Sequence, residues 1–211
     1  MFESILPWYS DNYDAIRENL AKVGDIRMIQ VNFSQYSRRY QSYKEGKVLP
    51  VFDPQLDGGA LYDLGVYSVH WVMGLVGIPQ RTVYFPNIGY SGVDTSGTLV
   101  MDYGTFQAVC STAKDSQSPG RCVVQGDEGY ILMESHPGEC HRISLKENGK
   151  DAVELDRIPL GEPFANVYKR ILPIVESDGY DTCYAMMEKV IEVMQVMEEA
   201  RKNAGIQFSC D

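Results

Sequence analysis

The sequence is short of basic residues. It contains 19 Lys and Arg against 29 Asp and Glu, which gives a formal net charge of −10 at pH 7 and a pI near 4.8. Proteins that bind nucleic acid gather lysine and arginine against the phosphates. No such cluster occurs here, only short pairs such as Arg38-Arg39. We therefore expect no nucleic-acid partner.

Long hydrophobic runs are also missing. The longest mostly apolar stretch, "VHWVMGLVGI", is about half as long as a membrane-spanning helix requires. The first residues carry no charged segment followed by an apolar run, so they do not resemble a signal peptide. We expect no membrane partner and a cytoplasmic location.

Cysteines are few and have no metal-binding spacing. No CxxC motif occurs, the number is odd, and the residues are scattered along the chain. This pattern favours reduced thiols over a disulfide framework and predicts no metal site. The five are Cys110, Cys122, Cys140, Cys183 and Cys210.

The remaining composition is that of a globular domain. With 211 residues, 44% apolar and 23% charged, the chain is long enough to form a stable core without covalent staples. Hydrophobic periodicity predicts a first helix from residue 10 or 11 to 24, and alternation of Ile29, Val31 and Phe33 with polar residues predicts a strand. Residues 37–57 have the composition of a loop.

A second helix is predicted from about 59 to 75, and strand patterns then dominate up to about residue 157. The β-prone runs lie at 82–90, 96–103, 105–113, 121–126, 129–135, 141–146 and 151–156. Two helices are predicted at the end, over 163–177, where Pro173 should cause a kink or an early end, and over 181–203, with Asp181 as N-cap. The last helix has an apolar stripe of Tyr184, Met187, Val190, Ile191, Met194 and Met197, which we assign to the core.

These elements predict a single α+β domain over residues 1–211, with an open, largely antiparallel sheet and helices packed on one face. Several strand runs are apolar at both parities, as in strands that are buried on both faces. We expect the second face to pack on another subunit, which makes the protein a homo-oligomer, most simply a dimer. The alternative is that a loop covers that face.

The stretch "GGALYDLGVYSVHW", residues 58–71, has the most informative pattern. At about 100° per residue, Asp63, Tyr67, His70 and Gly74 fall on one stripe opposite the apolar positions. This stripe is predicted to face solvent or a cleft. A phenol can donate and accept a proton, but only if a nearby cation lowers its pKa. No lysine lies near this stripe in the sequence.

Alternatives to catalysis remain for each of these residues. An Asp–Tyr pair four residues apart is also common on the exposed side of an ordinary helix, and His70 suits a packing or capping role as well as a proton relay. The glycines Gly58 and Gly59 precede the helix and would allow the backbone to approach a cofactor closely.

The string GGAL-x-DLG-x-Y, with "PWYSDNYDAIRENLAKVGDIRMIQVNFSQYS" before it and "GLVGIPQ" after it, resembles the C-terminal half of the Gfo/Idh/MocA oxidoreductases. The segments "MDYGTFQAVCSTA", "VVQGDEGYILME" and "EVMQVMEEARKNAGIQF" extend the resemblance along essentially the whole chain. It implies a C-terminal domain like that of glyceraldehyde-3-phosphate dehydrogenase, with substrate contacts and an open sheet used for dimerisation. An N-terminal Rossmann domain of such enzymes binds NAD or NADP.

By this resemblance Asp63 and Tyr67 are the catalytic residues, with a lysine from the first domain as the third member of the set. His70, Asn32, Tyr36 and Arg38 are candidate substrate-binding residues. Gly58 and Gly59 are candidate cofactor-binding residues.

One departure from the family is large. No GxGxxG turn and no Glu-Lys-Pro segment occurs in the chain. We therefore expect a fragment without the Rossmann domain, inactive alone, from an NAD(P)-dependent dehydrogenase or reductase that acts on a sugar, polyol or diol. Two alternatives are a non-catalytic module for substrate binding and dimerisation, and an NAD-dependent glycosidase.

Overall fold

The strands form one sheet. They are β1 (Ile26–Ser34), β2 (Arg81–Ile88), β3 (Asp94–Asp102), β4 (Gln107–Ala113), β5 (Arg121–Gly126), β6 (Gly129–Met133), β7 (Ile143–Glu147) and β8 (Val153–Glu154). Their order in the sheet is β2-β3-β4-β1-β5-β6-β7-β8. In this computed structural model, which describes residues 3–158, 163–209 and 211, β1 and β4 run parallel and the other described pairs run antiparallel.

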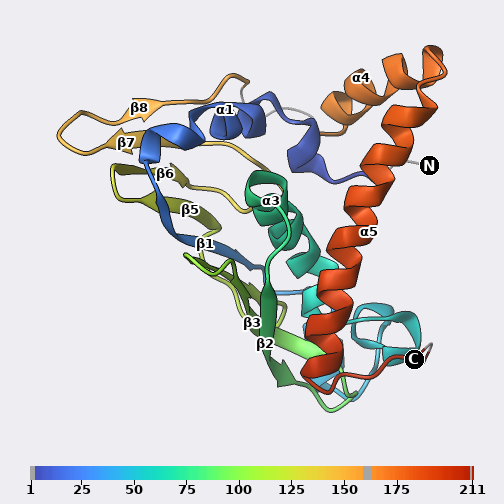
Figure 1. Ribbon diagram of the computed structural model, residues 1–211. Helices are drawn as coiled ribbons and strands as arrows, with labels where there is room; N and C mark the ends of the chain where they lie inside the picture. Colours follow the sequence, from blue (N-terminus) through green and yellow to red (C-terminus); the bar gives the residue numbers. More distant parts are fainter. Residues whose placement is uncertain (1–2, 159–162, 210) are drawn as a thin grey trace.

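The helices cover one face of this sheet. The longer ones are α1 (Asp11–Asn19), α3 (Val66–Val76), α4 (Pro163–Glu176) and α5 (Tyr180–Asn203). The shorter ones are η1 (Leu6–Tyr9), η2 (Leu20–Val23), α2 (Tyr40–Lys44), η3 (Pro50–Phe52), η4 (Pro54–Leu56) and the π-helical turn η5 (Leu61–Gly65). Figure 1 shows the sheet, α3 and α5 in successive layers. The predicted open, largely antiparallel sheet with helices on one face is confirmed.

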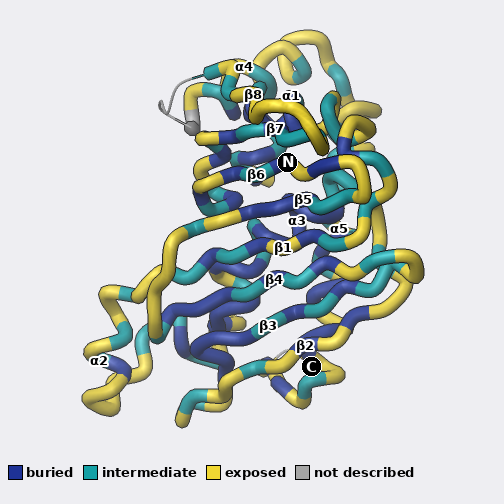
Figure 2. Tube along the Cα trace, turned by 90° about the vertical axis from the view of Figure 1, so that its left-hand side faces the viewer, coloured by how far each residue is buried: buried dark blue, intermediate teal, exposed yellow. Residues whose placement is uncertain are grey.

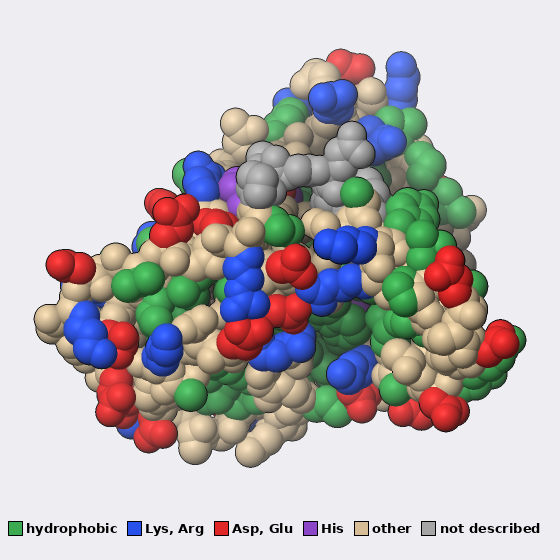
Figure 3. Space-filling view, turned by 90° about the horizontal axis from the view of Figure 1, so that it is seen from above, with side chains coloured by type: hydrophobic (Ala, Val, Ile, Leu, Met, Phe, Trp, Pro, Cys, Tyr) green, Lys and Arg blue, Asp and Glu red, His purple; other side chains and the backbone are tan. Residues whose placement is uncertain are grey.

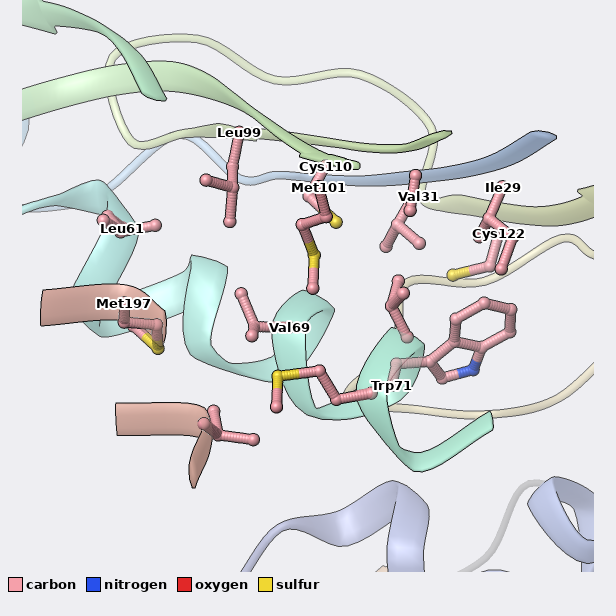
Figure 4. Packing of buried hydrophobic residues seen from close by; sticks show 14 of the residues in the cluster. Ile29, Val31, Leu61, Val69, Trp71, Leu99, Met101, Cys110, Cys122 and Met197 are labelled. Carbon is pink, nitrogen blue, oxygen red and sulfur yellow. The ribbon is translucent and has the colours of Figure 1, made fainter. Parts of the chain in front are cut away.

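The core lies between the sheet and α3, with α5 on the far side of that helix. Ile29 and Val31 of β1 are buried, as their alternation predicted. In Figure 4, Val69 and Trp71 of α3 lie under the strands, Val69 near Met101 and Trp71 near Ile29 and Cys122, and Met197 of α5 lies beside the same helix. Because this helix is covered on two sides, its sequence is apolar nearly all round.

The opposite face of the sheet is exposed. On β2, Val83 and Phe85 are 41% and 62% exposed, whereas Thr82 and Tyr84 beside them are buried. Figure 2 looks onto the sheet and shows buried positions alternating with more exposed ones along the strands. Tyr130 of β6 is exposed to a similar extent.

Two details of the C-terminal helices differ from the sequence-based prediction. Helix α4 continues past Pro173 to Glu176, because a proline so near the helix end removes only one late hydrogen bond. In α5, Tyr184 and Ile191 are more than half exposed, and the N-cap position is Gly179 rather than Asp181. The buried residues of α5 all lie in its second half, from Val193 onward.

Charged side chains of both signs are interspersed over the end of the molecule that carries α1 and α4 (Figure 3). There, Arg170 of α4 forms ion pairs with Asp11 and Asp14 of α1. None of the described helices combines the length and apolarity that a bilayer span requires. Cys110, Cys122 and Cys140 are buried free thiols, and Cys210 lies outside the described residues.

Candidate functional site

The site is built where the only parallel pair of described strands ends. In the register of β1 and β4, Ser34 lies beside Ala113. The chain after β1 stays bound to the end of β4: the N–H of Gln35 donates to the Ala113 carbonyl (2.9 Å), and that of Ser37 donates to the Lys114 carbonyl (2.8 Å). These bonds fix the loop 35–39 along the carboxyl end of β4.

The helix with the catalytic candidates begins at the same edge. Its first turn, η5, is π-helical, a form that occurs frequently at functional sites. The buried carboxylate of Asp94 accepts hydrogen bonds from the Leu61 N–H and the Tyr84 hydroxyl, both at 2.7 Å. Burial raises the pKa of Asp94 above its ordinary value. Asp94 thus ties the first turn of the helix to β3 and β2.

The glycine pair before this helix serves the fold. Gly59 has φ +134°, and a Cβ there would lie 2.2 Å from Oδ1 of Asp94. A Cβ on Gly58 would lie 2.8 Å from the Asp53 nitrogen and 2.9 Å from the Pro50 carbonyl oxygen. The close backbone approach is therefore to this chain itself. The N–H groups of the pair are also engaged, since Gly58 donates to the Asp53 carbonyl (2.9 Å) and Gly59 donates to the Val51 carbonyl (3.0 Å). Gly58 nevertheless lines a hollow of about 460 Å³ beside Asp63, and the cofactor-binding role of Gly58 and Gly59 stays a prediction.

Asp63 lies on the surface of this edge and has a cationic partner. Its carboxylate forms an ion pair with the ammonium of Lys114, the residue directly after β4. The Lys114 side chain is only 6% exposed, whereas that of Asp63 is 45% exposed. The buried Lys114 ammonium thus holds the Asp63 carboxylate in place, and the exposed side of the carboxylate can contact a ligand.

Sequence reasoning missed Lys114 because it lies 51 positions from Asp63. A signal was available: a single lysine comes directly after the apolar run 107–113. Since β1 and β4 end at one edge, that lysine comes to the same place as the loop 35–39.

Tyr67 lies beyond Asp63 and is half-buried. Its ring meets the ring of Phe33 edge-on, with centroids 5.9 Å apart. Within the described part of the chain the hydroxyl has no hydrogen-bond partner. Burial, and next the Asp63 carboxylate, raise the pKa of Tyr67 above its ordinary value. The cation that would lower this pKa does not come from Lys114, which is paired with Asp63.

His70 does not belong to the exposed stripe. It has no exposed surface, and its ring meets that of Trp8 edge-on at 4.7 Å. Burial lowers the pKa of His70 to about 4, so the imidazole is neutral at pH 7. The predicted contact of His70 with substrate is corrected accordingly, because the side chain is part of the core. The π turn contains an extra residue, so a uniform 100° step through residues 61–65 misplaces the positions after it.

Gly74, the last member of the predicted stripe, is partly exposed and packs closely against the N-terminal segment. A Cβ there would lie 2.4 Å from the Tyr13 hydroxyl and 2.8 Å from Nε1 of Trp8. Of the stripe, Asp63 is exposed, Tyr67 and Gly74 are partly exposed, and His70 is buried.

A hollow of about 540 Å³ adjoins the ion pair. Its lining includes two of the predicted substrate-binding residues, Tyr36 and Arg38; the full set is Gln35, Tyr36, Ser37, Arg38, Arg39, Asp63 and Lys114. A second hollow of about 460 Å³ also includes Asp63 and Arg39, so these two residues lie between the two hollows.

Asn32, the remaining substrate-binding candidate, is engaged elsewhere. Its amide donates to Oγ of Ser118 and to the carbonyl of Pro119, each at 2.8 Å. It holds the loop before β5 and does not line either hollow around Asp63.

Comparison with known proteins places this domain in a family of oxidoreductases. Residues 14–132 match the family profile described as GFO/IDH/MocA C-terminal domain. The chain belongs to the Gfo/Idh/MocA family, of whose C-terminal domain it is an example.

Named relatives make the likeness more specific. The chain is 27% identical over its whole length to scyllo-inositol 2-dehydrogenase (NADP(+)) IolU of Bacillus subtilis (strain 168), of which it spans 64%. It is 32% identical to the uncharacterized oxidoreductase YgjR of Escherichia coli (strain K12), of which it spans 63%. The chain thus spans less than two thirds of the length of either relative.

Solved structures show the same fold. The aldose-aldose oxidoreductase of Caulobacter crescentus, complexed with glycerol, superposes on 97% of this chain and 61% of its own, with a TM-score of 0.74 at 16% identity. At that identity the likeness concerns the fold.

Proposed function

We propose that this chain is the substrate-binding and proton-handling half of an NAD(P)-dependent oxidoreductase that acts on a sugar, polyol or diol hydroxyl. The observation that carries the proposal is the Asp63 carboxylate, fixed by Lys114 and half exposed beside a hollow, with Tyr67 one turn along the same helix. One relative supports the substrate class, since it is a scyllo-inositol 2-dehydrogenase (NADP(+)).

The residues of this chain would manage the proton of the reaction. Oxidation of a carbinol removes a hydride from carbon and a proton from oxygen, which leaves a carbonyl. Tyr67 takes the proton from the substrate hydroxyl or returns it in the reverse direction, and Asp63 accepts a hydrogen bond from a substrate hydroxyl and orients it. By the family resemblance, a nicotinamide cofactor would be held mainly by a Rossmann domain that is not part of these 211 residues, and when bound it would supply the hydride acceptor.

Tyr67 needs help from outside as well. Its pKa is raised by burial and by Asp63, so the phenolate is disfavoured within this chain alone. A cation contributed by the rest of the protein, a lysine by family resemblance, would stabilise the phenolate. For this reason we propose that the 211 residues alone are inactive.

The exposed sheet face completes the proposal. Val83, Phe85 and Tyr130 present apolar surface on the side that no described helix covers. A second copy of the protein packed on this face would bury it, which makes the active form a homo-oligomer.

The test is hydride transfer by the gene product that carries these residues, assayed with NAD⁺ and NADP⁺ and a panel of polyols and sugars. Tyr67→Phe should lower kcat by about 10² to 10⁴, the usual contribution of a general acid or base. Tyr168→Phe is the matched control, since that side chain is 65% exposed on α4 and should leave kcat unchanged. A loss of less than about tenfold for Tyr67→Phe would contradict the proposal.

A titration of NADH into the 211-residue chain separates the alternatives. We expect no binding in the micromolar range, because the chain has no GxGxxG turn and the N–H groups of Gly58 and Gly59 already donate to carbonyls of this chain. Micromolar binding would show that the cofactor site lies within this chain. Release of a sugar leaving group without net cofactor turnover would indicate a glycosidase instead of a dehydrogenase.

A further inference from the structure

The charge of the hollow beside Asp63 is opposite to that of the protein. The chain carries a net charge of −10, yet the hollow is lined by Arg38, Arg39 and Lys114 against a single carboxylate, that of Asp63. Since Lys114 and Asp63 neutralise one another, the two arginines give the hollow an excess of two positive charges.

These arginines differ from most others in the described chain. Six arginines pair with carboxylates: Arg17, Arg27, Arg81, Arg157, Arg170 and Arg201. Arg38 and Arg39 are exposed and form no ion pair with any described residue. An unpaired guanidinium presents a planar fork of donors that matches a carboxylate or phosphate.

The backbone keeps the two arginines at this edge. The Ser37 N–H is bound to the Lys114 carbonyl (2.8 Å), and the Arg39 N–H donates to Oγ of Ser37 (3.2 Å). Both arginines therefore lie on a loop that is hydrogen-bonded to the end of β4. Tyr36 in the same loop is 38% exposed and adds an aromatic face to the lining.

We propose that this hollow binds an oxyanion carried by the substrate, a carboxylate or phosphate, so that the enzyme acts on an acidic sugar or polyol rather than a neutral one. The proposal rests on the proposed function, whose reacting hydroxyl would lie at Asp63. Arg38 and Arg39 bind the acid group, and Asp63, on the wall of the same hollow, receives a hydroxyl. A small sugar acid has both groups within one molecule.

The test uses direct binding to the 211-residue chain, which requires no hydride transfer. Isothermal titration compares D-glucuronate with D-glucose and myo-inositol 1-phosphate with myo-inositol. Each acidic probe should bind at least about tenfold more tightly than its neutral counterpart, the effect of one charge-assisted contact. The preference should shrink as NaCl is raised, because exposed charges are screened.

Variants locate the effect. The double variant Arg38→Gln/Arg39→Gln should abolish the acid preference and leave the affinity for neutral probes unchanged. Arg121→Gln is the matched control: Arg121 is exposed, has no ion pair with the described residues and lies outside the hollow. Equal affinity for acidic and neutral probes in the wild type, or an acid preference that survives the double variant, would overturn the proposal.

Two further probes identify the source of the anion. Inorganic phosphate should bind more weakly than the sugar acids, and NADP⁺ should not compete with them. Phosphate that binds as tightly as the acids, or NADP⁺ that displaces them, would assign the arginines to an anion other than the substrate. An inactive gene product whose chain still prefers acids would contradict the proposed function and leave this binding site standing.

Discussion

The two partners of the Asp63–Lys114 ion pair differ in exposure, so their replacement should destabilise the protein by different amounts. The Lys114 side chain is 6% exposed and that of Asp63 is 45% exposed. Asp63→Asn leaves an ammonium without its counter-ion in a place that water hardly reaches. Lys114→Met leaves a carboxylate that the solvent of the hollow can hydrate. The first change should therefore destabilise the protein more than the second.

The exposures set the magnitudes. Breaking a fully buried pair costs about 3–5 kcal/mol, and an exposed pair is worth about 0.2–1 kcal/mol. With one partner half exposed, we expect Asp63→Asn to lower the free energy of unfolding by about 2 kcal/mol, which is about 5 °C in Tm for a chain of this size. Lys114→Met should lower it by less than about 1 kcal/mol, because methionine retains the apolar stem.

Urea unfolding of the four proteins in a double-mutant cycle measures these values. Asp63→Asn in the Lys114→Met background should cost almost nothing, since the orphaned cation is gone. Lys202→Met is the control, because Lys202 and Glu198 are both 50% exposed; it should change the free energy by less than about 0.5 kcal/mol. Equal unfolding midpoints for Asp63→Asn and wild type, or two costs that simply add, would refute the reasoning.

Three other predictions concern the frame of the site. Gly59→Ala places a Cβ 2.2 Å from Oδ1 of Asp94 at φ +134° and should lower the free energy of unfolding in urea by more than roughly 2 kcal/mol. Gly46→Ala is the control, because Gly46 has φ +88° and no neighbour within 4 Å; it should lower the free energy of unfolding by about 1 kcal/mol. The pKa of His70 falls from 6.5 in the unfolded chain to about 4 in the folded one, so the unfolded chain binds a proton first as the pH falls. The free energy of unfolding should therefore fall by up to about 3 kcal/mol between pH 6.5 and pH 4. In His70→Leu this pH dependence of the unfolding free energy should be absent. Phe85→Lys, at a position 62% exposed on the bare sheet face, should convert a dimer to a monomer in light scattering, and an unchanged mass would count against the proposed interface.

Much of the fold could be predicted because burial on one face leaves a period of two in the strands. Ile29, Val31 and Phe33 of β1 alternate as expected and are buried, and the run 121–126 coincides with β5. The family string around Asp63 and Tyr67 was equally readable. The lateral pairing of the strands could not be read, because it depends on contacts far apart in the sequence.

The errors at the site have one source in common: a local rule was applied where tertiary structure decides. The step of 100° per residue put His70 on the surface, but a π turn precedes it and Trp8 packs against it. The glycine pair suggested close approach of the backbone to a cofactor, but Gly59 packs against the Asp94 carboxylate and Gly58 against the backbone of residues 50–53. No lysine lies near Asp63 along the chain, yet Lys114 reaches its carboxylate from the end of β4.

The position of Asp63 is a consequence of the sheet topology. After β1 the chain forms η5 and α3 and then enters β2. Strand β2 runs in the same direction as β1, because it is antiparallel to β3, which is antiparallel to β4, and β4 is parallel to β1. A helix that connects two strands of one direction begins at the edge where the first strand ends and returns to the edge where the next begins. Its first turn therefore lies at the carboxyl edge of β1. Lys114 lies at this edge for the same reason, since it comes directly after β4, the strand parallel to β1. A carboxylate in the first turn thus meets the residue at the end of β4, while a residue one turn later, Tyr67, lies further under the sheet and is half-buried.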